Sequence, residues 1–151
     1  MQLADAIILW LVGFIVTLGF AVLFNVPMKA LMSVSVIGAF GLLLRGVMKA
    51  DGVILELATL CGSLFIGLAG FWQARRINTP RLVFTITGII AMVPGVPAYE
   101  MLLYFRNYDV LQGMQSGFKV ALITGAIAGG LSLARALTEL EWRTVEEHAD
   151  D

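Results

Sequence analysis

The sequence predicts an all-α, multi-pass membrane protein, a bundle of about five helices whose fourth is broken. Hydrophobic residues make up 59% of the 151-residue chain and charged residues only 14%, which is far more apolar than a soluble domain. The stretch from Ala6 to Met28 carries no charged side chain and, at 1.5 Å per residue, exceeds the roughly 30 Å hydrocarbon core of a bilayer. A Pro-Gly-Val-Pro cluster at 94–97 interrupts a later uncharged stretch, and proline cannot donate to a helical ladder.

Five apolar segments follow one another along the chain. The second is short for a span and is closed by Arg45 and Lys49, and the fifth is also short. Segments below roughly 20 residues must borrow flanking residues or thin the bilayer, so a four-span arrangement with a re-entrant second segment stays open. The segments are 6–24, 30–44, 53–73, 82–99 with the break, and 120–134, the last running on into an amphipathic stretch at 135–145.

The domain organisation is simple. Residues 1–145 form a single transmembrane domain, and residues 146–151 form an acidic polar tail that holds His148, the single histidine. The acidic residue Asp5 before the first segment, and the length of that segment, favour a retained helix over a signal peptide. Cys61 is the single cysteine, so we expect no intrachain disulfide, no cysteine metal site and no cofactor.

Basic residues at the segment ends indicate the orientation. With five spans, the amino-terminal side carries four of them and the opposite side six, which favours a cytoplasmic carboxyl terminus. These residues are scattered singly, without the patch that a phosphate backbone requires, so nucleic acid is not an expected partner. The two sets are Arg45, Lys49, Arg106 and Lys119, against Lys29, Arg75, Arg76, Arg81, Arg135 and Arg143.

The break in the fourth segment is the leading indication of function. In hydrocarbon, freed backbone groups must find partners, so broken helices survive only inside protein or beside a water-filled cavity. Transporters use such breaks to present bare backbone and half-helix ends to a substrate. We therefore expect Pro94, Gly95 and Tyr99 to line a substrate path, and the kink to hold Glu100 in the same cavity.

Two acids and one amide are further candidates. Glu56 and Glu100 are acids that could lie at membrane depth, where a carboxyl group is by default a proton-coupling candidate. The alternatives are that Glu56 reaches the interface beside Lys49 and Asp51, and that Glu100 forms a loop salt bridge to Arg106. Asn25, just before Pro27, either caps the following helix or contacts a small polar solute. No serine-histidine-acid set, metal cluster or phosphate loop is recognisable, so an enzyme is not expected.

Two motifs of the chain form a recognisable pattern. They are the run Gly19-Phe20-Ala21-Val22-Leu23-Phe24-Asn25-Val26-Pro27 and the run Met92-Val93-Pro94-Gly95-Val96-Pro97-Ala98-Tyr99. In these runs, and on into the glycine-rich last segment, the sequence resembles the threonine/serine exporter family. More narrowly, the chain looks like the small subunit of the split members, equivalent to the carboxyl-terminal half of the fused exporters. Asn25, Pro27, Pro94, Gly95 and Tyr99 are the matched positions, whereas Pro97 and Glu100 rest on the local argument.

The resemblance implies a multi-pass transporter of the bacterial inner membrane that exports small polar metabolites with energy from the proton gradient. Its substrates would be threonine and serine, or a dicarboxylate such as succinate, and its partner a larger membrane subunit. Independently, five segments and one break are half of what a transporter with two structural repeats needs. A second copy of this chain could supply the rest instead. The remaining alternatives are a non-transporting scaffold that stabilises a partner, and a channel, which would need a polar ring from several copies.

Overall fold

The computed structural model describes the backbone of residues 3–147 and the side chains of residues 3–139. Within this part of the chain every regular element is a helix, which confirms the all-α prediction. The elements are α1 (Leu3–Leu23), α2 (Met28–Ala50), α3 (Leu55–Arg76), α4 (Arg81–Ile89), the 3-10 helix η1 (Ile90–Met92), α5 (Gly95–Arg106) and α6 (Val110–Glu147). The acidic tail expected at 146–151 lies outside the residues whose side chains are described.

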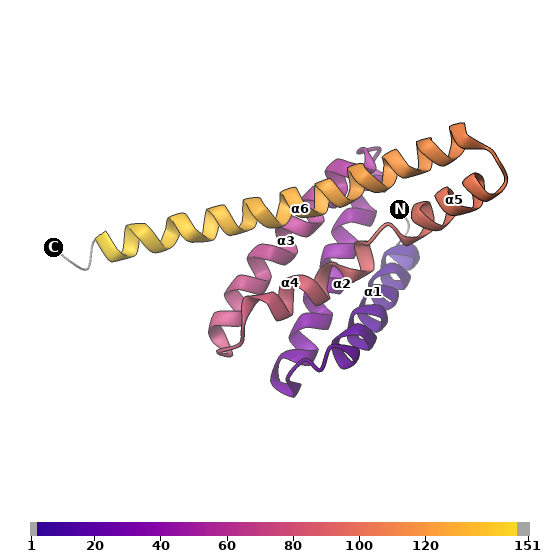
Figure 1. Ribbon diagram of the computed structural model, residues 1–151. Helices are drawn as coiled ribbons and strands as arrows, with labels where there is room; N and C mark the ends of the chain where they lie inside the picture. The colour runs from indigo at the N-terminus through magenta and orange to yellow at the C-terminus, as the bar shows by residue number, and fades with distance from the viewer. Residues whose placement is uncertain (1–2, 148–151) are drawn as a thin grey trace.

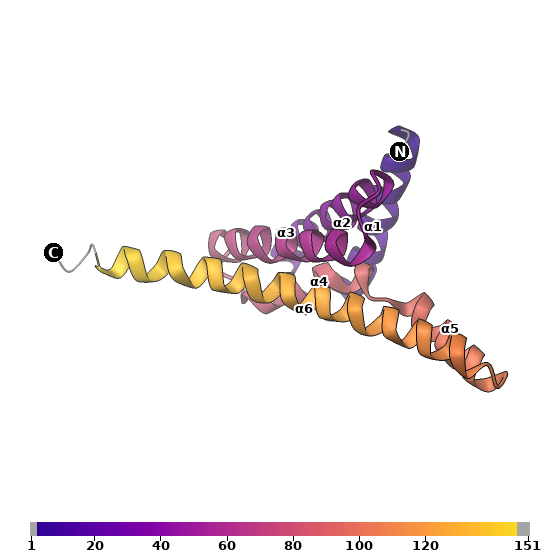
Figure 2. The same ribbon diagram turned by 90° about the horizontal axis from the view of Figure 1, so that it is seen from above.

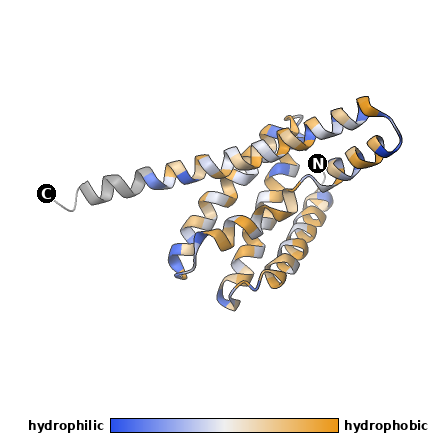
Figure 3. Cartoon of the chain, viewed as in Figure 1, coloured by the Kyte–Doolittle hydropathy of each residue, from blue (hydrophilic) through white to orange (hydrophobic). Residues whose placement is uncertain are grey.

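Four helices are long and apolar enough to cross a membrane, namely α1, α2, α3 and α6. The pair formed by Arg81–Met92 and Gly95–Arg106 also passes this test, but it is bent by 52°. The described chain therefore has four candidate spans, or five if the bent pair is one span. Many large apolar side chains point outward, Ile7, Ile8 and Ile15 on α1 among them, and Figure 3 shows the polar residues gathered at helix ends and turns. This pattern suits contact with lipid.

The helices α1, α2 and α3 run up and down side by side, and α4 packs against α2 and α3 (Figure 1). The helix α6 packs along α3 and extends past the bundle, where its amino-terminal part packs against α5. Seen from above, the α5–α6 hairpin projects away from α1, α2 and α3 (Figure 2). The break thus directs α5 away from the bundle formed by α1, α2 and α3.

Two segment predictions need correction. The second segment, expected at 30–44, is the continuous helix α2 of 23 residues, so it is not re-entrant. It continues past Arg45 and Lys49 because long basic side chains can bury their stems while the charged heads reach polar partners. The fifth segment, expected at 120–134, is part of the 38-residue helix α6. Hydropathy underestimated the length of this helix because the residues that extend it at both ends are more polar.

Four helices end in the same way, with one residue in the left-handed conformation. Its φ is 56° at Asn25, 87° at Gly52, 50° at Asn78 and 60° at Tyr108. In each turn the next amide bonds back five residues, as Val26 N–H does to the Ala21 carbonyl at 3.0 Å, which is a Schellman closure. Two of the turns share an Asn-x-Pro sequence, and Lys29 joins them by donating to the carbonyls of Ile77 at 2.9 Å and Asn78 at 3.3 Å. These two turns therefore lie at one end of the bundle.

Candidate functional site: the broken fourth segment

The break replaces two residues of a helical ladder with open backbone. Val93 N–H bonds to the Ile90 carbonyl at 3.3 Å, and Gly95 N–H reaches only to the Val93 carbonyl at 2.8 Å. The α-helical pattern resumes when Ala98 N–H bonds to the Pro94 carbonyl at 3.1 Å. Pro94 itself has no N–H to contribute. The proline-glycine cluster is therefore the cause of the bend, as the sequence predicts.

A cation from another helix meets the opened backbone. In an unbroken helix the Met92 carbonyl would accept a bond from the amide of residue 96. Here the guanidinium Nη1 of Arg45, on α2, donates to that carbonyl at 3.0 Å. Arg45 is half-buried and borders a hollow of about 270 Å³ that Lys49 and Leu55 also line. Arg45 therefore connects the break, through its bond to Met92, with this hollow.

The side chain of Met92 fixes the break against the core. Met92 is fully buried and belongs to a core cluster with Ile66, Ile123 and Ile127. A Cβ on Gly62 would lie 2.8 Å from Met92 Cε and 2.9 Å from the Gly41 carbonyl oxygen, so both glycines leave room for the methionine. The close approach of α2 and α3 at these glycines forms the socket that holds the end of η1.

The predicted residues of the fourth segment separate into two groups. Pro94 is buried at the bend, and Gly95 is exposed, with no atom within 4 Å of a Cβ placed on it. Tyr99 is 63% exposed and Glu100 is exposed, on the outer surface of α5. Glu100 does not share the hollow of Arg45, because the bend directs α5 away from α2. In the described part of the chain Glu100 also makes no ion pair with Arg106, which is six residues along the same helix and so on another face.

Asn25 and Pro27 lie far from the break. They precede α2, whereas Arg45 lies near its other end, which at 1.5 Å per residue places them about 25 Å apart. Pro27 is the residue before the first turn of α2, and no side chain caps that turn. The expected capping role of Asn25 is therefore wrong. Asn25 instead takes the left-handed position of the turn, which asparagine tolerates.

Glu56 lies at the same end of the bundle as Arg45. It is half-buried in the first turn of α3, next to Leu55, which lines the hollow of Arg45. Sequence reasoning missed Arg45 because it took the charge as the end of the second segment. The available signal was a cation inside a stretch long enough to span, since an ionisable residue at membrane depth is by default a functional candidate.

The fold and the break define a polytopic helical membrane protein with one broken span. A family model described as "Threonine/Serine exporter, ThrE" matches residues 9–137. This match covers most of the chain, which therefore belongs to the threonine/serine exporter family, a family of transporters. No solved structure was found to match it.

Proposed function

We propose that this chain is the small subunit of a secondary transporter that exports small polar metabolites. The observation that carries the proposal is the opened backbone at Met92–Gly95 with the Arg45 guanidinium on it. A broken span with a cation at the break presents both a hydrogen-bonding donor and bare backbone to a solute, which are the elements that secondary transporters use at their binding sites. Membership of a transporter family supports this reading.

The number of candidate spans supports a two-part assembly. Secondary transporters place their sites between two structural repeats, and the described residues provide four candidate spans, or five if the bent pair is one span. We propose that a larger membrane subunit of the same family supplies the second half, in the inner membrane of a bacterial cell. A second copy of this chain is the other source. The outward apolar surface of the α5–α6 hairpin, which includes Leu102, Phe105 and Phe118, suits contact with a partner as well as with lipid.

The substrate and the driving force are proposals of the same kind. Threonine and serine are the expected solutes from the family, and a dicarboxylate such as succinate is the further candidate. Proton antiport would use a carboxyl group of this subunit or of its partner. The two candidate carriers in this subunit are Glu56, which neighbours the hollow of Arg45, and Glu100, which is exposed on α5.

A scaffold that stabilises a larger transporter is the alternative, and one observation favours it. Met92 sits in a glycine socket and its carbonyl has a donor, so the break can also be a packed kink whose backbone is satisfied by a neighbouring helix. In that case the bend would hold α5 in position for a partner and no solute would pass it.

Gly95→Leu separates the two functions. A Cβ placed on Gly95 meets no atom within 4 Å, so we expect leucine to be accommodated there and to change mainly the surface of the break. Gly125→Leu is the matched control, because Gly125 on α6 is equally open. Transport requires that Gly95→Leu lowers export while the amount of assembled complex is unchanged and Gly125→Leu exports normally. Full export by the Gly95 variant would favour the scaffold.

A further inference from the structure

A second polar hollow lies between α3, α4 and α6, away from the break. Its volume is about 460 Å³, within the range of small-molecule sites. It opens beside the first turn of α4, and the break lies at the other end of that segment. Its polar lining comes from two arginines and two hydroxyl residues: Arg81, Thr85, Ser132 and Arg135.

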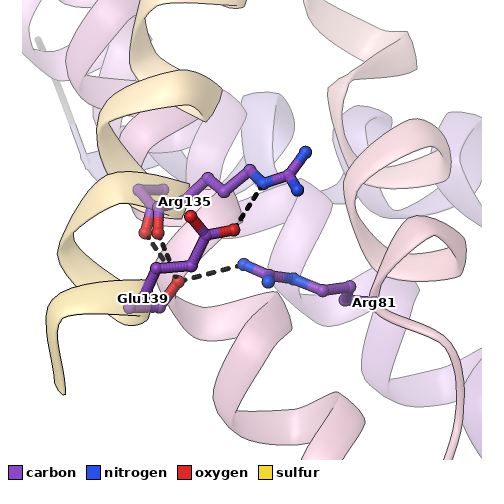
Figure 4. A network of polar contacts seen from close by, with 5 residues as sticks. Arg81, Arg135 and Glu139 are labelled. Atoms are coloured by element: carbon purple, nitrogen blue, oxygen red, sulfur yellow. Dashed lines mark hydrogen bonds and ion pairs between the residues drawn. The ribbon is translucent and has the colours of Figure 1, made fainter. Parts of the chain in front are cut away.

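Arg81 is held in place across the gap between α4 and α6. Its Nη2 donates to the Thr138 hydroxyl at 3.0 Å (Figure 4), and its guanidinium carbon lies 4.9 Å from the centroid of the Phe71 ring. Thr138 is buried, and its hydroxyl is in turn anchored to the carbonyls of Ala134 and Arg135. Arginine has five N–H donors, so this one hydrogen bond leaves most of the guanidinium group for a ligand. The group is therefore oriented before any ligand arrives.

Arg135 approaches the same hollow from α6. Its Nε donates to Glu139 Oε1 at 2.7 Å, and Figure 4 shows the guanidinium extended from α6 on the side where Arg81 reaches across. This ion pair joins two exposed side chains through Nε, and the terminal nitrogens of Arg135 are not the donors in it. Two guanidinium groups from different helices thus border one hollow.

The charges around the hollow favour an anion. Arg81 and Arg135 both line it, and the described carboxylate of Glu139 pairs with Arg135. The first turn of the nine-residue helix α4 adds the positive end of its dipole beside Arg81 and Leu82. Arginine forks match carboxylates in a bidentate way, and the Ser132 hydroxyl can bond a further oxygen.

We propose that this hollow is a binding site for the carboxylate of a small organic acid or amino acid. The proposal rests on the function proposed above, because it assigns the hollow as a loading site of the exporter on the side that carries most of the basic residues. On that side the excess of arginine and lysine indicates the cytoplasm, from which an exported solute must enter. The carboxylate binds between Arg81 and Arg135.

The test is equilibrium binding of labelled succinate, labelled threonine and labelled inorganic phosphate to the purified complex in nanodiscs of zwitterionic lipid. We expect a carboxylate to bind and Arg81→Gln or Arg135→Gln to weaken it, each on the order of ten-fold or more. Ser132→Leu fills the hollow without removing a charge and should also abolish binding, which keeps the test valid if an arginine variant fails to fold. Arg76→Gln is the control, since Arg76 stacks on Trp72 and does not line the hollow.

Two results would overturn the proposal. One is carboxylate binding that is unchanged in Arg81→Gln, Arg135→Gln and Ser132→Leu. The other is that the hollow takes phosphate or an anionic lipid headgroup alone, so that labelled phosphate binds but neither labelled succinate nor labelled threonine binds in zwitterionic lipid. Export is measured separately with the same variants. If the wild type exports and all three variants export equally well, the proposed loading site is rejected and the proposed transport function is retained. If the protein binds a carboxylate but exports nothing, the binding site is retained and the transport function is rejected.

Discussion

The guanidinium of Arg45 donates to the carbonyl of Met92 at 3.0 Å, linking α2 to the broken span. The two residues are 47 positions apart in the chain, so the contact is a product of the fold. It places a cation beside backbone that the proline-glycine cluster has opened. A buried backbone acceptor that loses its donor in an apolar environment is costly, and this explains why a half-buried charge is tolerated in α2.

Arg45→Leu is expected to weaken the fold and export together. It removes the donor to the Met92 carbonyl, at a cost of about 1–3 kcal/mol for an unsatisfied buried group. Arg45→Lys keeps the charge and one donor and should recover part of both. The readouts are the thermal unfolding of the purified protein in detergent and the rate of export from cells.

Arg106→Leu is the matched control, because Arg106 is an exposed basic residue in the last turn of α5. It should leave unfolding and export close to wild type. Equal behaviour of Arg45→Leu and Arg106→Leu would mean that the contact with Met92 does not hold the break.

Gly62→Ala is expected to destabilise the bundle by about 1–3 kcal/mol, the usual cost of overpacking. The new methyl group would lie 2.8 Å from Met92 Cε and 2.9 Å from the Gly41 carbonyl, and the second of these neighbours is backbone that cannot move aside cheaply. In a Met92→Ala background Gly62→Ala should cost less than in the wild type, because only the contact with the Gly41 carbonyl remains. Unfolding in detergent measures both.

Gly19→Ala provides the comparison, since a Cβ there meets nothing within 4 Å and Gly19 lies inside α1. It should be neutral, or stabilise by up to roughly 1 kcal/mol through helix propensity. If Gly62→Ala were as harmless as Gly19→Ala, the socket for Met92 would have no energetic role.

Tyr108→Asn is expected to stabilise the protein by about 0.5–1 kcal/mol, because tyrosine is strained at a φ of 60° and asparagine is much less so. The side chain of Tyr108 is 92% exposed, so few contacts are lost. The converse substitution, Asn25→Ala, places a less tolerant residue in the matching turn and should lower stability by a similar amount. A stability change of the opposite sign at either position would argue against the Schellman closures as a determinant of the fold.

Proton coupling predicts that a carboxyl variant uncouples transport from the pH gradient. Glu56→Gln and Glu100→Gln each remove one candidate carrier. The variant that lacks the true carrier should still exchange labelled solute across the membrane but should no longer respond to an imposed pH difference. Measurements of solute exchange and of gradient-driven flux in proteoliposomes distinguish loss of coupling from loss of transport. Asp51→Asn, an exposed acid between α2 and α3, is the control. Normal gradient response in both glutamine variants would place the carrier in the partner.

The sequence was sufficient for the helical fold, the order of the segments and the position of the break. Proline chemistry acts locally, so Pro94 and Gly95 could be placed at the bend without knowledge of any neighbour. The neighbours themselves could not be predicted, since hydropathy does not say which helix faces which. Arg45 and Arg81 looked like charges at segment ends, and their contacts with Met92 and Thr138 appear only once the helices pack.

The direction of α5 was equally beyond the sequence. A proline pair predicts a bend but not its angle. The 52° bend places Tyr99 and Glu100 on the outer surface. The separation of Asn25 from the break follows from the length of α2, which hydropathy underestimated. A charge inside a long apolar stretch, such as Arg45, was the one sequence signal that could have led further.

Export of labelled threonine, serine and succinate from cells that lack both endogenous subunits tests directly whether this chain is a transport subunit. The cells would express this chain alone, a cognate large subunit alone, or both, with Gly95→Leu as a further form of this chain. We expect export only when both subunits are present. We also expect export to be lost with Gly95→Leu although the complex still assembles. Export by the large subunit alone, unchanged when this chain is added, would contradict it.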